Sequence, residues 1–242
     1  MLTPKDIASM LDYAALAPNL TDADVRKVAE NAVKYGTATV CARPGDMKLV
    51  AEALAAGSIV KPCTVIGFPH GTNLTRVKVY EAECALDDGC LELDMVMNIG
   101  KLKSGDCAYV EQDIRAVAEA AHRRGALLKV ILENCFLTDP EKAAACQIAE
   151  RAGADFVKTS TGFAASGATI ADVKLMRASV SEKVRVKAAG GMRNLDAVLA
   201  ARAAGAARCG VSAVPAIMEE AERRFAEGKL AEASDGELGD GY

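Results

Sequence analysis

The chain has 242 residues, of which 51% are hydrophobic and 26% charged, and its formal net charge is −4. This composition excludes a disordered chain, and the negative charge argues against a general nucleic-acid-binding protein. No apolar segment approaches the roughly 20 residues that a membrane-spanning helix needs. The first residues lack the basic segment and apolar core of a secretory signal peptide. We therefore expect a cytoplasmic protein that does not associate with membranes.

Short apolar segments alternate with amphipathic ones along nearly the whole chain. The predicted strands are residues 11–16, 37–42, 63–68, 91–98, 127–133, 155–159, 184–188 and 207–211. Eight strand–helix units in a chain of this length match the (β/α)8 TIM barrel, whose typical size is about 250 residues. An open doubly wound sheet would be expected to show a Gly-x-Gly-x-x-Gly turn after its first strand. Ala17-Pro18-Asn19-Leu20 follows that strand instead, which favours the barrel.

Helix signals support this division of the chain. Thr21 and Asp24 form a predicted capping box, and Gly36 ends the helix that follows. Residues 100–106 are expected to form a loop ahead of the helix in the longest unit. From residue 227 onward the composition turns to Gly, Ala, Asp and Glu, which is typical of a mobile tail. We predict one barrel domain over residues 1–226 and a flexible tail over residues 227–242.

The cysteines and histidines point away from a metal site. The chain has eight cysteines, mostly inside apolar segments, and none forms a Cys-x-x-Cys pair. This pattern predicts buried, reduced thiols rather than disulfides or a zinc site. His70 and His122 are far apart in the sequence, so neither a histidine-based metal site nor a Ser-His-Asp triad is expected.

Two lysines stand at the ends of neighbouring predicted strands. Lys158 ends one short apolar segment and Lys187 ends the next. Adjacent strands lie about 4.8 Å apart, so the two amines should perturb each other. A lysine with the ordinary pKa of about 10.4 is a poor nucleophile, and its pKa must fall by about three units before it attacks a carbonyl. One lysine can serve as the nucleophile while the other stays charged, and the pattern does not decide which.

A carboxylate on the fourth predicted strand completes this group. Alternation places Glu92, Asp94 and Val96 on one face of the strand, and the helix-facing side of a barrel strand is apolar. Asp94 should therefore point into the barrel, either as a proton shuttle beside the lysines or as a structural ion pair. Lys129 on the fifth predicted strand either joins an interior charge network or has a structural role only.

Glycines and small polar residues follow the last three strands, where barrels commonly bind phosphate. Gly162 follows the sixth strand, Gly190 and Gly191 the seventh, and Gly210 and Ser212 the eighth. Arg193 adds a positive charge that can hydrogen-bond to a phosphate. Their clustering predicts a phosphorylated ligand.

With these residues in view, the chain closely resembles the deoxyribose-phosphate aldolase family of class I aldolases over about residues 12–225. The segments that carry the resemblance are GFPHG (67–71), ELDMV (92–96), LKVILE (128–133), DFVKTSTGF (155–163) and KAAGG (187–191). The resemblance implies a carbon–carbon lyase of deoxyribonucleotide and carbohydrate catabolism. It would cleave 2-deoxy-D-ribose 5-phosphate reversibly to D-glyceraldehyde 3-phosphate and acetaldehyde, with no metal or organic cofactor.

The resemblance also implies roles for individual residues. Lys158 would form the Schiff base, with Lys187 and Asp94 as the acid–base pair. Tyr242, at the end of the tail, either reaches the active site or is a solvated tail end. A homo-oligomer, dimer or tetramer, is expected. The residues expected to contact substrate are Asp12, Cys41, Thr161, Gly162, Gly190, Gly191, Arg193, Gly210 and Ser212.

Two residues depart from the family pattern. Ala14 stands where the family usually has threonine, and Ala213 where a small polar residue often follows Ser212. Three alternatives therefore stay open: a related Schiff-base aldolase with another aldehyde or phosphosugar preference, a catalytically silent phosphosugar-binding barrel, and a cofactor-free phosphosugar isomerase. The presence of Lys158, Lys187 and Asp94 together disfavours the last two.

Overall fold

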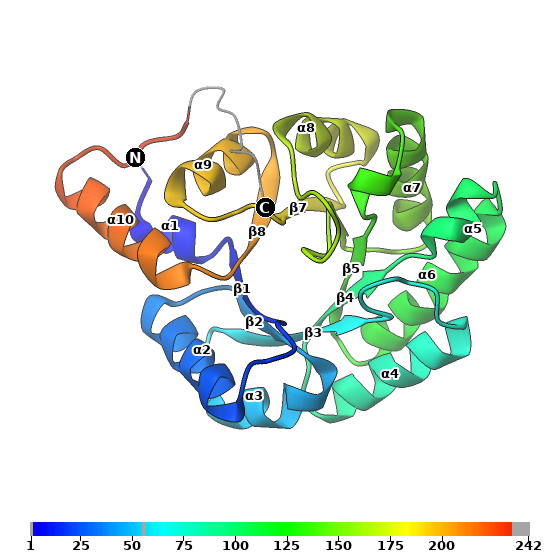
Figure 1. Cartoon of the computed structure of the whole chain (residues 1–242), viewed down its shortest axis with the longest axis horizontal. Helices are drawn as coiled ribbons and strands as arrows, with labels where there is room; N and C mark the ends of the chain where they lie inside the picture. Colours follow the sequence, from blue (N-terminus) through cyan, green and yellow to red (C-terminus); the bar gives the residue numbers. More distant parts are fainter. Residues whose placement is uncertain (1, 55–56, 234–242) are drawn as a thin grey trace.

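In the computed structural model, which describes residues 2–54 and 57–233, parallel strands close into a barrel that helices surround (Figure 1). The eight strands pair in sequence order, and β1 closes the ring by pairing with β8. The strands are β1 (Leu11–Ala15), β2 (Thr39–Ala42), β3 (Lys61–Ile66), β4 (Glu92–Val96), β5 (Leu127–Ile131), β6 (Phe156–Lys158), β7 (Arg185–Ala189) and β8 (Ala206–Val211). All eight predicted strands are present, with ends that differ by at most two residues, and the TIM-barrel prediction is confirmed.

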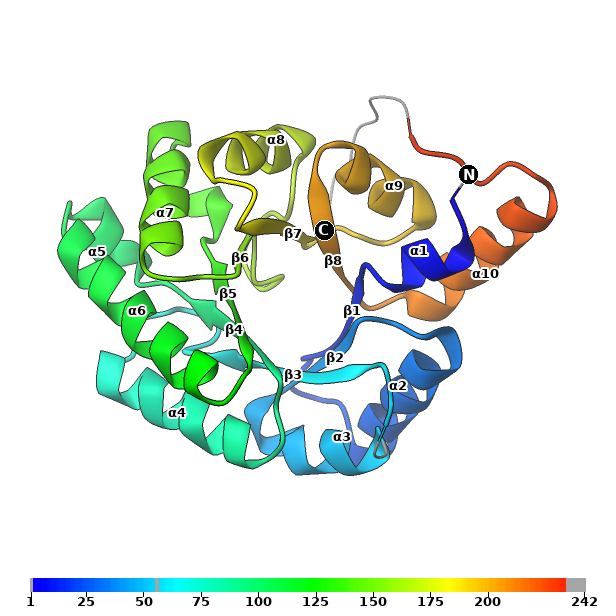
Figure 2. The ribbon, with the colours of Figure 1, turned by 180° about the vertical axis from the view of Figure 1, so that it is seen from behind.

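The helices form the outer layer, and the ring is equally clear from behind (Figure 2). They are α1 (Pro4–Ala8), α2 (Asp22–Tyr35), α3 (Met47–Ala53), α4 (Thr75–Asp87), α5 (Ile99–Lys103), α6 (Cys107–Arg123), α7 (Asp139–Arg151), α8 (Ile170–Ser179), α9 (Leu195–Ala203) and α10 (Val214–Ala226), with 3-10 turns η1 (Pro44–Asp46) and η2 (Asn134–Phe136). None of the helices in the described part of the chain combines the length and the apolarity needed to cross a bilayer.

Local sequence signals set several helix ends. At the start of α2, the Thr21 side chain accepts a hydrogen bond from Asp24 N, and the Asp24 side chain accepts one from Thr21 N. At its end, Gly36 adopts the left-handed conformation with φ 70°. The prediction of a loop over residues 100–106 is wrong in part, because the helix α5 covers Ile99–Lys103. The Asn98 side chain accepts a hydrogen bond from Lys101 N and so caps this short helix.

The main hydrophobic core lies between the strands and the helices. The outward faces of the strands supply residues such as Leu93, Met95 and Met97, which are fully buried. A second, smaller cluster of Cys41, Cys63 and Val65, with Leu16 and Phe68 packed against it, is separate from that core. Alternation along the strands therefore leaves the opposite face of β4 free to carry polar groups into the barrel.

The tail and the cysteines differ in part from expectation. Leu230 is buried and Glu232 pairs with Arg202, so these first residues of the predicted mobile tail pack against the barrel. All eight cysteines are free, but Cys84, Cys107 and Cys135 are exposed rather than buried. Their apolar neighbours in sequence lie on other faces of α4, α6 and η2, so an apolar segment did not imply burial of each member.

A buried ion pair joins α4 to α6 outside the barrel. Lys78 Nζ lies 2.6 Å from Asp113 Oδ2 and donates to Val96 O at 3.0 Å, and both side chains are fully buried. Asp113→Asn should lower the free energy of unfolding by about 3–5 kcal/mol, because it leaves an ammonium buried without its counter-charge. Urea unfolding measures this loss. Lys27→Ala, which removes a solvent-exposed ion pair to Glu30, should leave the midpoint unchanged. An unchanged midpoint in Asp113→Asn would contradict this role.

Candidate active site

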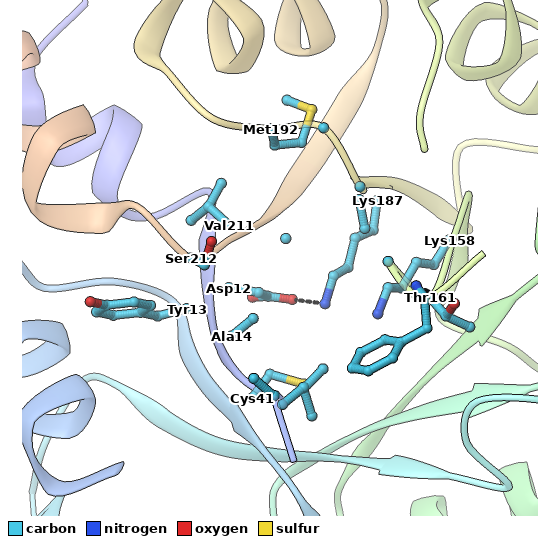
Figure 3. A pocket seen from close by; sticks show the side chains of 18 of the residues that line it. Asp12, Tyr13, Ala14, Cys41, Lys158, Thr161, Lys187, Met192, Val211 and Ser212 are labelled. Carbon is cyan, nitrogen blue, oxygen red and sulfur yellow. Dashed lines mark hydrogen bonds and ion pairs between the residues drawn. The ribbon is translucent and has the colours of Figure 1, made fainter. Parts of the chain in front are cut away.

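A cavity of about 470 Å³ opens where the strands end, and the predicted site residues line it. Asp12, Lys158 and Lys187 reach it from β1, β6 and β7 (Figure 3). The expected substrate-contacting residues that line it are Asp12, Cys41, Thr161, Gly162, Gly190, Gly191, Arg193, Gly210 and Ser212. The structure thus brings together the whole predicted substrate-binding set. Tyr242 lies outside the described residues.

One carboxylate joins the two strand-end lysines. Strand register sets Lys158 beside Lys187. Asp94 Oδ2 accepts hydrogen bonds from Lys158 Nζ at 2.8 Å and from Lys187 Nζ at 2.7 Å. Asp94 is fully buried beneath the cavity, whereas Lys158 and Lys187 line it. A single oxygen therefore lies within hydrogen-bond distance of both amines.

A wider charge network surrounds this pair inside the barrel. Lys129 Nζ lies 2.7 Å from Glu92 Oε2 and 2.8 Å from Asp94 Oδ1, which settles its place in the network. The ion-paired groups are the cations of Lys129, Lys158, Lys187 and Arg208 and the carboxylates of Asp12, Glu92 and Asp94. Fully ionised, this set carries one positive group more than negative groups. Among the described residues, Lys158 forms an ion pair with Asp94 and with no other carboxylate.

The charges of the network stabilise the ionised carboxylate of Asp94 and the protonated amine of Lys187. Burial by itself raises the pKa of Asp94, but the ammonium groups of Lys129, Lys158 and Lys187 hold that pKa well below its usual value. For Lys187 burial lowers the pKa, and the carboxylates of Asp12 and Asp94 outweigh it and raise the pKa. Asp12 Oδ2 lies 2.5 Å from Lys187 Nζ. Resting Asp94 is therefore ionised and Lys187 protonated.

The Cys41 thiol lines the cavity, and Cys63 packs beside it inside the barrel. Figure 3 shows Cys41 and Ala14 across the cavity from Lys158. A hydrogen bond with Cys63 lowers the pKa of Cys41, whereas burial raises the pKa of Cys63 well above its usual value. Ligand atoms of Cys41, Cys63 and Asp94 lie within 4.8 Å of one another. The Asp94 oxygens already accept hydrogen bonds from lysine ammonium groups, whose charge opposes that of a metal cation.

The glycines adopt conformations that other residues avoid. Gly162, Gly190 and Gly191 have φ of 88°, 81° and 78°. A Cβ added at Gly210 would lie 3.1 Å from Ala189 Cβ and 3.5 Å from Lys187 Cε. A side chain at Gly210 would therefore crowd Ala189 Cβ and contact the Lys187 stem, which favours glycine at this strand position.

Sequence reasoning missed several residues of the site. Arg208 was not singled out, although it shares a strand face with Gly210 and donates to Asp12 Oδ1 at 2.6 Å. Alternation along β8 could have placed it in the barrel. Tyr13, Leu20 and Met192 also line the cavity. Leu20 and Met192 lie in loops, so strand alternation does not mark them, whereas Tyr13 lies on β1 next to Asp12.

The chain forms a closed (β/α)8 barrel, with two adjacent lysines at its mouth and a carboxylate between them. These features define the class of barrel enzymes that have lysines in their active sites. A model of the DeoC/LacD family of aldolases matches residues 6–218. The chain is 50% identical over 217 residues to the deoxyribose-phosphate aldolase of Thermococcus gammatolerans, covering 89% of this chain and 96% of that protein. It is likewise 50% identical over 218 residues to that of Bacillus cytotoxicus, covering 90% of this chain and 97% of that protein.

A solved structure agrees. The tetrameric deoxyribose phosphate aldolase of Aeropyrum pernix superimposes with a TM-score of 0.84 at 33% identity, covering 90% of this chain and 92% of that chain. The chain belongs to the DeoC/LacD family of aldolases, and its resemblance to deoxyribose-phosphate aldolases is confirmed.

Proposed function

We propose that this chain cleaves 2-deoxy-D-ribose 5-phosphate reversibly to D-glyceraldehyde 3-phosphate and acetaldehyde through a Schiff base on Lys158. The observation that carries the proposal is Asp94 Oδ2, which hydrogen-bonds to Lys158 and Lys187 beneath a cavity that both lysines line. The relatives that are 50% identical bear the name of this activity.

The reaction needs an amine that accepts the aldehyde carbon. Lys158 attacks C1 of the open-chain sugar, and loss of water from the carbinolamine gives an iminium. Removal of the proton from the C3 hydroxyl breaks the C2–C3 bond. The three-carbon aldehyde departs, and the bonding electrons stay on the nitrogen-bound fragment as an enamine. Protonation of C2 and hydrolysis then release acetaldehyde and restore the amine.

Charge balance supports Lys158 as the nucleophile. Loss of one proton leaves the interior network with equal numbers of cations and carboxylates. Within the part of the chain that the structure describes, Lys158 is the lysine of this network with a single carboxylate partner. Lys187 contacts both Asp12 and Asp94, which favour its charged form. We assign Lys187 to stabilising the oxygen charge that develops during carbinolamine formation. Asp94 connects the two amines and provides the path for proton transfer between them.

Late-strand glycines, Ser212 and Arg193 form the proposed phosphate end of the cavity. Arg193→Gln should raise KM for 2-deoxy-D-ribose 5-phosphate roughly 10-fold, because one charge-assisted hydrogen bond at an exposed position is lost. KM for unphosphorylated 2-deoxy-D-ribose should not change. Steady-state kinetics with both sugars measure the difference. An equal effect on both sugars would show that Arg193 does not bind the phosphate.

The activity itself is tested by incubating the protein with 2-deoxy-D-ribose 5-phosphate and measuring D-glyceraldehyde 3-phosphate release with a coupled dehydrogenase. Release of this product is expected. A protein that binds the sugar phosphate and releases none would be a silent binding barrel. Ala14 lines the cavity and carries no hydroxyl, which favours one second candidate, an aldolase with another acceptor aldehyde. A panel of aldehydes, with acetaldehyde as donor, measures that preference.

We also propose a homo-oligomer, either a dimer or a tetramer. Leu74, Val77 and Tyr80 are exposed by 52%, 43% and 69%, and they follow one another at helical spacing at the start of α4. Such an apolar stripe suits contact with a second copy, and the Aeropyrum pernix relative is tetrameric. Analytical ultracentrifugation measures the state, and a monomer at micromolar concentration would contradict it. We place the enzyme in the cytoplasm and keep the division into residues 1–226 and 227–242 as a proposal.

A further inference from the structure

Glu133 has an unusual backbone conformation at the end of β5. Within residues 2–54 and 57–233 it is the one non-glycine residue with a positive φ, at φ 56° and ψ 66°. A left-handed conformation at such a residue costs on the order of 1–3 kcal/mol and persists only where surrounding contacts fix it. Its side chain is 2% exposed and does not line the cavity.

The contacts that fix Glu133 come from the loop after Lys158. Thr161 N lies 3.2 Å from both Glu133 carboxylate oxygens, and the Thr161 hydroxyl donates to Oε2. Thr161 Oγ1 in turn accepts a hydrogen bond from Phe163 N at 3.0 Å. Burial raises the pKa of Glu133, although the hydrogen bonds from Thr161 oppose the shift. One carboxylate thus accepts hydrogen bonds from both donors of Thr161, the backbone N–H and the hydroxyl.

This loop forms the cavity wall next to Lys158. Thr161, Gly162 and Phe163 line the cavity, and Figure 3 shows Thr161 beside Lys158. The Phe163 ring packs edge-on against Phe68 at 5.2 Å. The neighbouring Ser160 hydroxyl is buried with no hydrogen-bond partner in the described part of the chain, so it does not anchor the loop.

We propose that Glu133 is a positioning residue that holds the Thr161–Gly162–Phe163 wall in the shape that binds the phosphate-bearing half of the substrate. The left-handed backbone directs its carboxylate from β5 to the loop after β6. Glu133 acts through Thr161 and does not touch the reacting atoms. This inference rests on the proposed function. It separates binding of the three-carbon half from Schiff-base formation with acetaldehyde, which uses Lys158, Lys187 and Asp94 but not this wall.

The primary test is Glu133→Gln, which keeps the shape of the side chain but removes its charge and one acceptor. KM for 2-deoxy-D-ribose 5-phosphate should rise about 10-fold, because the wall is no longer held before binding. The rate of borohydride trapping of acetaldehyde on Lys158 should change less than about 2-fold, since this step does not use the wall. A merely structural role would lower the cleavage rate and the trapping rate together through loss of folded protein, and it would leave KM unchanged.

Further variants separate the effect of the Glu133 side chain from effects on the backbone and on neighbouring structure. Thr138→Ala removes the capping hydroxyl of α7, close in sequence to Glu133, and should lower the melting temperature without changing KM. Glu133→Gly relieves the backbone strain, so it should be more stable than Glu133→Ala and yet show the same KM. In a Thr161→Val background, Glu133→Gln should raise KM by less than about 2-fold further, because the shared contact is already lost.

An unchanged KM in folded Glu133→Gln would overturn the inference. So would a double variant whose KM increase equals the product of the increases in Glu133→Gln and Thr161→Val, or equal losses of the trapping rate and the cleavage rate in Glu133→Gln. Failure of the proposed function is distinguishable, because the wild-type protein would then neither cleave the sugar phosphate nor trap acetaldehyde. Hydrogen exchange gives a readout that needs no activity. Glu133→Gln should speed exchange over residues 160–164, and unchanged exchange there would also overturn the inference.

Discussion

Replacement of Lys158 by alanine should lower the rate of 2-deoxy-D-ribose 5-phosphate cleavage by about 10⁴-fold or more, because no other group replaces the amine that forms the iminium. The barrel should still fold. Removal of Lys158 takes away the excess cation of the interior network and leaves Lys129, Lys187 and Arg208 with three carboxylate partners. Coupled kinetics measure the activity, and thermal unfolding measures the stability.

Two variants serve as controls, one that keeps the positive charge at position 158 and one that removes a lysine outside the cavity. Lys158→Arg keeps a cation beside Asp94 but lacks a nucleophilic amine, so it should be as inactive as Lys158→Ala. Lys142→Ala removes a mostly buried lysine that pairs with Asp172 outside the cavity, and it should retain the wild-type rate per folded molecule. Cleavage by Lys158→Ala within about 10-fold of the wild-type rate would exclude Lys158 as the nucleophile.

Asp94→Asn should damage both catalysis and folding. The rate of cleavage should fall by about 10²–10⁴-fold, since the oxygen that links the two amines no longer accepts their protons. The free energy of unfolding should fall by about 3–5 kcal/mol, because three buried ammonium groups lose their shared counter-charge. Urea unfolding and coupled kinetics measure the two losses.

The double variant Asp94→Asn/Lys158→Ala separates these effects. Removing Lys158 relieves part of the excess positive charge, so the double variant should be more stable than Asp94→Asn alone and remain inactive. Equal free energies of unfolding for the double variant and Asp94→Asn would contradict the proposed interaction between Lys158 and the other charges of the network.

The stability difference should also depend on pH. Folding lowers the pKa of Asp94. Its contribution to stability is therefore present above the unfolded pKa of about 3.9 and is lost as the pH falls toward the folded value. The free energies of unfolding of the wild type and Asp94→Asn should converge below about pH 4.

The strand-end lysines and Asp94 could be predicted because strand periodicity assigns each residue to a face. Parallel neighbours then bring the ends of strands together, as Lys158 and Lys187 show. The glycines after the last strands could be predicted for the same reason. The order of the two lysines could not, because it depends on which carboxylates each one meets.

Contacts that depend on three-dimensional detail were not predictable. Glu133 lies in a segment that reads as an ordinary strand end, and its left-handed conformation is fixed by Thr161, which is 28 residues away in the sequence. Arg208 meets Asp12 only because β8 closes onto β1. The packing of Leu230 likewise has no local signal in a tail rich in glycine and acidic residues.

Borohydride trapping tests the central claim most directly. The protein is incubated with acetaldehyde, reduced, digested and examined by peptide mass spectrometry. A two-carbon adduct on Lys158, absent from Lys158→Arg, is the predicted result. No adduct in a protein that binds the sugar phosphate would contradict the aldolase mechanism, and an adduct on Lys187 instead would reverse the roles of the two lysines.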